Sequence, residues 1–285
     1  MSTPQPPMPQ AAAVGSPYAG YTSPIPVVRT HLGHAVASEW TKIRSVRSTM
    51  WTLGVFLVLV IGIGLLVAVL VRSNASDGSL ANDNPLSYGV FGLLLGSICI
   101  ITLGVLTTAS EYGTGMIRTT MTACPSRSRV LAAKAIVFFA VAFTVTFVSV
   151  LLVALADVSI LSGAKSPSVQ EWLKGTFGIS LYIALLGLLS LVLGSVIRHS
   201  AGAITIMIGL VLAPLVLALF MLSPSLNWLR DALLNYSIPS QMSVFYARSS
   251  LAQGGPTGWD PLWIAVGVTA AAFAGAVWLL QQRDV

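Results

Sequence analysis

Few residues of this 285-residue chain are histidine, cysteine or charged, the types that most often act in catalysis or bind metal ions. The only histidines are His31, His34 and His199, and the only cysteines are Cys99 and Cys124. His31 and His34 share a helical face, but two histidines without a third ligand make a poor metal site. The chain contains no HExxH, GxSxG or GxxxxGK[ST] pattern, which are typical of zinc hydrolases, serine hydrolases and P-loop ATPases. We therefore predict that the chain is not an enzyme and holds no metal.

Six long apolar runs make up most of the chain. They cover roughly residues 51–71, 88–109, 135–156, 175–197, 201–222 and 261–280. Each run is close to the ~20 residues that an α-helix needs to cross a hydrocarbon layer of about 30 Å. Hydrophobic residues are 55% of the chain and charged residues only 8%. The sequence therefore predicts an all-α polytopic membrane protein, with a domain of six transmembrane helices within residues 51–285.

Positive charge alternates between the segments that join these runs. Segments 1–50, 110–134, 198–200 and 281–285 hold ten basic and three acidic residues, whereas the alternate segments hold five basic and six acidic residues. Short loops rich in Lys and Arg stay in the cytoplasm. Both termini are therefore predicted to be cytoplasmic. Nucleic-acid binding is not expected, because the basic residues adjoin spans and form no stripe on a soluble domain.

Ionisable residues are absent from the middle of every span by these boundaries, and Asp157 is counted with the loop after the third run. A charge at the bilayer centre costs at least ~2.5–3.5 kcal/mol, so it is kept where it carries protons, ions or substrate. The absence argues against an ion-coupled carrier with a carboxylate relay and against most intramembrane hydrolases. An uncharged pathway favours hydrophobic or amphipathic cargo.

The segment before the first span divides into two parts. Residues 1–28 contain seven prolines and are predicted to be a disordered cytoplasmic tail. In residues 29–50, Leu32, Val36, Trp40 and Ile43 recur at three- and four-residue steps, with basic residues mostly on other faces. This pattern predicts an amphipathic interfacial helix lying on membrane lipids. The alternative, a basic anchor for the first span, is compatible with it.

Residues 110–134 form the most informative loop. Gly113 and Gly115 can release the second helix where it meets water. A short amphipathic helix is predicted over residues 116–121, with Pro125 ending it and Ser126 capping the third span. Such a helix suits docking of a soluble partner, although many cytoplasmic loops have a similar pattern.

Small residues share one face of the second predicted span. They are Gly89, Gly92 and Gly96. Small residues allow helices to approach closely. The pattern predicts a tight helix contact, which lies either within one subunit or at a dimer seam.

Two segments resemble a known family. SEWTKIRSVRSTMWTL (residues 38–53) and EYGTGMIRTTMTACPSRSRVLAAK (residues 111–134) resemble the N-terminal segment and the second-span loop of actinobacterial ABC type-2 transporter permeases. The order Gly-Thr-Gly-Met at 113–116 replaces the commoner Gly-Thr-Ile. The resemblance covers nearly the whole chain from Val28. The loop residues that match the family pattern are Glu111, Tyr112, Gly115, Arg118, Thr119, Pro125, Arg127 and Lys134.

The resemblance implies the membrane subunit of an ATP-binding-cassette (ABC) exporter in the plasma membrane. Two such chains, as a homodimer or heterodimer, would pair with two ATPase subunits, which would hold the ATP and Mg²⁺. Residues 110–134 would be the coupling loop. Residues 223–260 would form outer re-entrant helices, parted by Pro239. The alternatives are a non-transporting membrane scaffold or immunity component, or a membrane enzyme that processes lipid or peptide.

The resemblance also assigns site residues. Glu111 and Arg118 are the first candidates for coupling, and a surface ion pair is the alternative for each. Glu39 either contacts the ATPase or pairs with Lys42 on the same helix face. The implied ATPase-coupling residues are Glu111, Tyr112, Gly115, Arg118, Thr119, Pro125 and Arg127. The implied residues of the interfacial helix are Glu39, Trp40, Lys42, Arg44 and Arg47.

Overall fold

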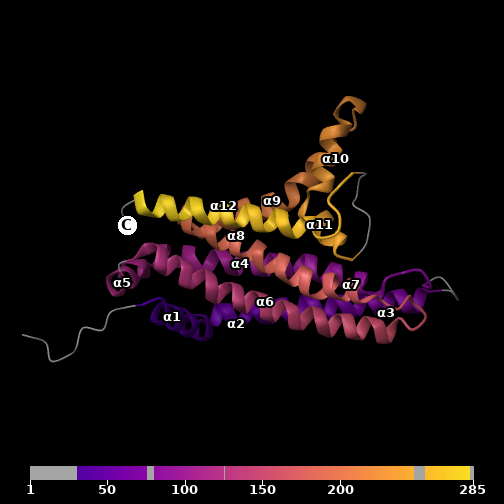
Figure 1. Cartoon of the computed structure of the whole chain (residues 1–285), viewed down its shortest axis with the longest axis horizontal. Coiled ribbons are helices and arrows are strands. Elements are labelled where there is room, and N and C mark those ends of the chain that lie inside the picture. Colours follow the sequence, from indigo (N-terminus) through magenta and orange to yellow (C-terminus); the bar gives the residue numbers. More distant parts are fainter. Residues whose placement is uncertain (1–30, 76–79, 125, 247–253, 283–285) are drawn as a thin grey trace, which may run out of the picture. The chain divides into compact units, whose positions relative to one another are not determined.

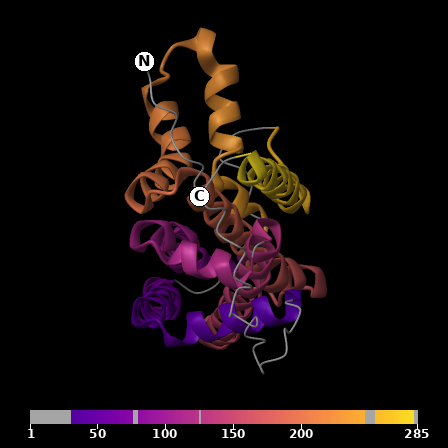
Figure 2. The ribbon, with the colours of Figure 1, turned by 90° about the vertical axis from the view of Figure 1, so that its left-hand side faces the viewer.

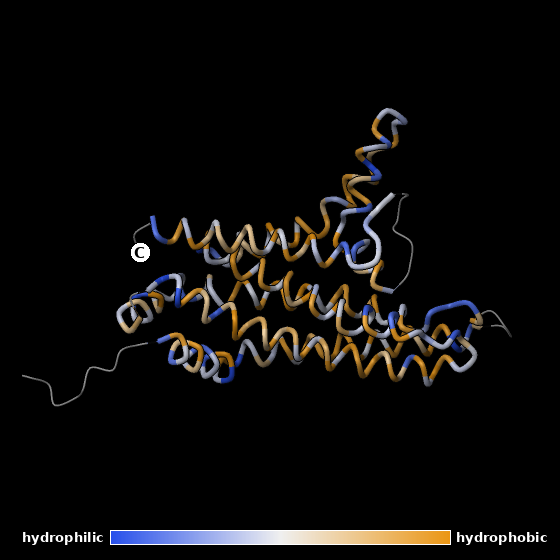
Figure 3. Tube along the Cα trace, viewed as in Figure 1, coloured by the Kyte–Doolittle hydropathy of each residue, from blue (hydrophilic) through white to orange (hydrophobic). Residues whose placement is uncertain are grey.

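Six membrane-spanning helices dominate the structure, a computed structural model that describes residues 31–75, 80–124, 126–246 and 254–282. No strand occurs within these ranges, so the predicted all-α fold with six spans is confirmed. The long helices lie side by side (Figure 1). Apolar residues occupy their middle and polar residues gather at both ends (Figure 3). The six spans are Arg47–Asn74, Pro85–Thr114, Arg127–Ile160, Val169–Ile197, Ser200–Phe220 and Asp260–Gln282.

Three of the spans are built from more than one helical segment. The first consists of α2 (Arg47–Leu57), the π-helix η1 (Val58–Ile63) and α3 (Gly64–Asn74). The second consists of the 3₁₀-helix η2 (Pro85–Gly89) and α4 (Val90–Thr114). The fourth consists of α7 (Val169–Trp172), the π-helix η3 (Leu173–Gly178) and α8 (Ile179–Ile197). The others are single helices: α6 (Arg127–Ile160), α9 (Ser200–Phe220) and α12 (Asp260–Gln282).

Short helices occupy the two ends of the bundle. At one end, here called the basic end, lie α1 (Leu32–Ser45), α5 (Met116–Ala123) and the α8–α9 turn (Figure 1). The opposite end, here called the far end, carries η2 and the segment between α9 and α12. That segment forms the 3₁₀-helix η4 (Pro224–Leu226), α10 (Asn227–Asn235) and α11 (Ile238–Val244). Figure 2 looks onto the basic end and shows α1 beside the first span.

The helix predicted over 29–50 is shorter in the structure. α1 ends at Ser45, Val46 has an extended backbone (φ −81°, ψ 115°), and α2 begins at Arg47. Arg47 therefore starts the first span and does not belong to α1. The break allows the polar α1 and the apolar first span to take different directions, each suited to its own surroundings.

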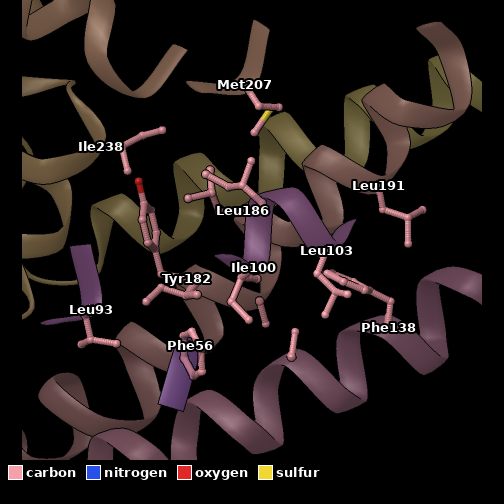
Figure 4. Packing of buried hydrophobic residues seen from close by; sticks show 14 of the residues in the cluster. Phe56, Leu93, Ile100, Leu103, Phe138, Tyr182, Leu186, Leu191, Met207 and Ile238 are labelled. Atoms are coloured by element: carbon pink, nitrogen blue, oxygen red, sulfur yellow. The ribbon is translucent and has the colours of Figure 1, made fainter. Parts of the chain in front are cut away.

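Helices α4 and α8 form the centre of the bundle. The Ser190 hydroxyl donates to the Ile101 carbonyl at 2.9 Å, and the Thr108 hydroxyl donates to the Leu191 carbonyl at 2.9 Å. Polar bonds of this kind and small side chains hold helices together in lipid. Figure 4 shows the surrounding packing of Phe56, Ile100, Phe138, Tyr182, Leu191 and Met207, which come from five of the six spans.

The glycine face of the second span packs against the first span of the same chain. A Cβ on Gly92 would lie 2.7 Å from the carbonyl oxygen of Val60, and a Cβ on Gly96 would lie 2.7 Å from the Val60 side chain. The close contact predicted from the glycine spacing is therefore made within one subunit by these two residues.

The far-end helices differ from the prediction in one detail. Pro239 was expected to part them, but it lies in the first turn of α11, and the break falls at Tyr236 and Ser237. Ser237 is the N-cap of α11, and its hydroxyl accepts a bond from the Ser240 N–H. Proline fits the first turn of a helix, because the N–H that it lacks has no partner there anyway.

Candidate functional site

Four charged side chains form a closed ring of ion pairs at the basic end. Lys134 Nζ lies 2.9 Å from Glu39 Oε2 and 2.6 Å from Glu111 Oε1. Lys42 Nζ lies 2.8 Å from Glu39 Oε1 and 2.9 Å from Glu111 Oε1. Each lysine thus bridges both glutamates. This ion-pair ring joins α1, which supplies Glu39 and Lys42, to α4 and α6.

Burial makes the ring more than a surface feature. Glu39, Glu111 and Lys134 are 4%, 7% and 3% exposed, whereas Lys42 is only half-buried. Buried charges are tolerated when opposite charges and hydrogen bonds compensate them, and here two cations meet two anions. Burial acts to lower the pKa of Lys42, but its hydrogen bonds to Glu39 and Glu111 outweigh that effect and raise the pKa above its usual value.

The ring lies outside the middle of the spans, which the sequence predicts to be free of ionisable groups. Glu111 and Lys134 are buried near the basic ends of the second and third spans, and Asp157 is buried near the other end of the third. The helices extend past the apolar runs, because α4 continues to Thr114 and α6 begins at Arg127. Lys134 was predicted to lie at the end of the loop. It lies about two turns inside α6, and it matched the family pattern without being chosen as a site residue.

Helix α5 begins at a tight turn directly after α4. Gly115 ends α4 with φ +74°, a left-handed conformation that favours glycine. Ile117 is buried, and Lys42 Nζ donates to Thr120 Oγ1 at 3.4 Å, so one face of α5 contacts the bundle and the ring. Arg118 and Thr119 are exposed on α5. They are therefore available to a partner, whereas Glu111 is not.

Two further contacts connect this region to the remaining spans. The guanidinium of Arg198, in the α8–α9 turn, lies over the Tyr112 ring at 5.0 Å from its centre. Arg127 Nη1 donates to the Leu280 carbonyl near the end of α12 at 2.8 Å. The residues flanking α5 thus contact the ends of the fourth, fifth and sixth spans.

The other predicted site residues lie apart from the ring. Trp40 and Arg44 are exposed on α1, with the Arg44 guanidinium 5.9 Å from the Trp40 ring centre. Arg47 is exposed at the start of α2, and Pro125 lies outside the described residues. The rings of His31 and His34 stack at 3.8 Å. Within the described part of the chain, no three potential ligands gather for a metal ion.

A cleft of about 300 Å³ separates α1 and the start of α2 from α4. Glu39, Lys42 and Glu111 lie on one part of its wall. The rest of the wall combines apolar and hydroxyl side chains. They are Ile43, Val46, Ser48, Thr49, Leu103, Leu106, Thr107, Ser110, Thr114 and Met116.

The architecture defines a multi-pass membrane protein with a short, anchored helix exposed at one end of its bundle. A family profile described as "ABC-2 family transporter protein" matches residues 35–223. The chain therefore belongs to the ABC-2 transporter family, and it is a permease component of an ABC transporter located in the plasma membrane. This family works together with an ATPase subunit. A comparison with curated proteins finds no match.

Proposed function

We propose that this chain is the permease half of an exporter that carries a hydrophobic or amphipathic molecule out of the cell. The observation that supports this best is the arrangement of α5. One face is anchored by Ile117 and Thr120, while Arg118 and Thr119 are exposed to a partner. A soluble ATPase subunit, holding ATP and Mg²⁺, would dock on this exposed face. Two permease chains would pair with two ATPase chains.

The ion-pair ring supplies a route for coupling. ATP-driven closure of the ATPase pair would shift α5. Because Lys42 bonds to Thr120 on α5 and to both glutamates of the ring, that shift would pull on α1, α4 and α6 together. Rigid helices with shared contacts transmit such motion as bodies. Glu111 acts in this scheme through Lys42 and Lys134, and Arg118 through direct contact with the partner.

The orientation follows from the same scheme. The basic end would face the cytoplasm, where an ATPase finds ATP, and α10 and α11 would lie on the outer side. The excess of Lys and Arg in the segments at the basic end agrees with this orientation. Both termini would then be cytoplasmic.

The cleft beside α1 supports an amphipathic cargo. Apolar side chains such as Leu103 and Leu106 would contact a hydrocarbon portion, whereas hydroxyls such as Thr107 and Ser110 would bond to polar groups. Its volume of about 300 Å³ is at the small end of the range for ligand sites, about 300–1,000 Å³.

Co-purification tests the proposal. The chain is expressed with each candidate ABC ATPase subunit, extracted mildly and weighed by native mass spectrometry. We expect a complex of two permease and two ATPase chains that hydrolyses ATP. A permease that inserts and folds but associates with no candidate ATPase would contradict the proposal and favour the scaffold alternative.

Charge reversal on α5 tests the docking face. Arg118→Glu should leave insertion and thermal stability unchanged but abolish cargo-stimulated ATP hydrolysis, because Arg118 is exposed on α5. Arg72→Glu is the matched control, since Arg72 is exposed in the last turn of α3 at the far end. Normal stimulation in a correctly inserted Arg118→Glu protein would exclude this residue from coupling.

A further inference from the structure

A buried carboxyl group without a hydrogen-bond partner lies in the third span. Asp157 is close to the far end of α6 and is 0% exposed. Its backbone carbonyl accepts the Leu161 N–H at 2.9 Å, as in a regular helix. Neither oxygen of its side chain forms a hydrogen bond with any residue that the structure describes. The ion-pair ring at the basic end makes no use of this residue.

The surroundings of Asp157 are apolar and tightly packed. A Cβ on Gly89 would lie 3.8 Å from Asp157 Oδ2 and 3.1 Å from Val153 Cγ1, so η2 closes over the carboxyl group. An adjoining cavity of only about 10 Å³ is lined by Gly89, Val153 and Tyr246, among others. That volume is at the lower limit for one water molecule. Bulk water therefore does not solvate the carboxyl group in this conformation.

Tyr246, which follows α11, interacts electrostatically with Asp157. Burial and the nearby carboxyl group both raise the pKa of the Tyr246 phenol, so the phenol stays neutral. None of the described cations forms an ion pair with Asp157, since the described salt bridges involve other acids. Other titratable side chains on elements packed against the outer half of α6 are Arg72, Tyr88, Lys174, Tyr182 and Asp260.

An ionised carboxylate in such a place would have neither donors nor water to stabilise it. Burying an uncompensated charge costs far more than burying a neutral polar group, and a carboxyl group in that position takes up a proton instead. We propose that Asp157 is a proton-binding residue, neutral in this conformation, which releases its proton when η2 and Tyr246 move away from α6 and admit water.

Proton release would couple pH to opening of the far end. The closed arrangement around Gly89 and Tyr246 binds one more proton than an open arrangement with a solvated, ionised Asp157. Acidic conditions would therefore favour the closed arrangement, and alkaline conditions would favour opening. This inference concerns the permease chain alone and does not depend on an ATPase partner or on the direction of transport.

Infrared spectroscopy of the full chain in lipid nanodiscs measures the protonation state directly. The difference between wild type and Asp157→Asn at neutral pH should show the C=O stretch of a protonated carboxyl group. Carboxylate bands in that difference would overturn the proposal, because they would show an ionised and compensated group. Asp157→Ser, which is also neutral and smaller, serves the same comparison if the Asn side chain does not fit.

Hydrogen exchange tests the coupling to opening. Amide exchange in residues 85–89 and 238–246 is compared between wild type and Asp157→Asn in the same buffer, so that the intrinsic effect of pH cancels. In acid the two should agree. In alkaline buffer the wild type should exchange about tenfold faster, because only it gains a charge that disfavours the closed state. Equal exchange in both buffers would contradict proton-linked opening.

Discussion

Lys134 Nζ on α6 and Glu111 Oε1 on α4 lie 2.6 Å apart in a place from which water is almost excluded. The same lysine also reaches Glu39 on α1. Without its partners, each of these side chains would be an uncompensated buried charge. The ion pairs therefore stabilise the packing of α1, α4 and α6 against one another. This dependence makes the ring suited to keeping α1, α4 and α6 in register.

Removing Lys134 should destabilise the protein strongly. Lys134→Met leaves Glu39 and Glu111 facing one another with only the half-buried Lys42 between them. Breaking a buried pair on one side costs about 3–5 kcal/mol. The expected result is a clear fall in the thermal unfolding midpoint in detergent. Lys165→Met is the control, because Lys165 is 58% exposed and its distance to Glu171 is 3.6 Å. Equal shifts in the two variants would show that the ring adds no stability.

The sequence predicted most of the fold but only part of the site. Six apolar runs of suitable length are a local property, and the structure contains all six spans. The positions of Glu39, Glu111 and Lys134 in one ring are not local, because these residues are far apart in the chain and meet only when α1 folds against α6. The sequence does contain one indication of the ring, because Lys42 in α1 and Lys134 after the second-span loop both carry a charge opposite to that of Glu111.

Helix ends caused the remaining errors. Apolar runs stop where the first polar residue occurs, whereas helices continue as long as their backbone bonds are satisfied. Asp157 was counted as a loop residue for this reason, although α6 extends to Ile160 and buries it. Its burial depends on η2 and on the segment after α11, and neither contact is visible in the spacing of residues along the third span.

Stability should fall at alkaline pH through Lys42. Because folding raises its pKa, the ammonium group stabilises the folded state fully below its usual value of 10.5, and this contribution is lost as pH rises through the higher folded-state pKa. Thermal unfolding of wild type should therefore show a loss above pH 10.5 that Lys42→Met lacks. Lys42→Arg, which remains charged, should also lack it. The same alkaline loss in all three proteins would assign it to other groups.

The contact of the first two spans should not tolerate a methyl group at Gly92. The new Cβ of Gly92→Ala would lie 2.7 Å from the Val60 carbonyl oxygen, and that backbone atom cannot move without bending η1. Overpacking of this kind costs about 1–3 kcal/mol. Gly62→Ala is the control, because no atom lies within 4 Å of its new Cβ. Unfolding midpoints in detergent compare the two variants, and an unchanged midpoint for Gly92→Ala would contradict the packing described above.

The turn between α4 and α5 should require a left-handed residue. Gly115→Ala places a Cβ in open space, so the only penalty comes from φ +74°, which costs an L-residue about 1–2 kcal/mol. Gly113→Ala also meets open space, but Gly113 lies inside α4 and should be neutral or slightly stabilising.

The variants Gly115→Ala and Gly113→Ala also separate the role of the turn in coupling from its role in stability. If Gly115 sets the direction of α5, Gly115→Ala should also reduce cargo-stimulated ATP hydrolysis in the complex, while Gly115→Asn should restore much of it, because asparagine tolerates this conformation. Gly113→Ala should retain full stimulation. Loss of stability in Gly115→Ala with stimulation intact would show that the turn contributes to folding alone, and that α5 reaches its partner without a fixed direction from α4.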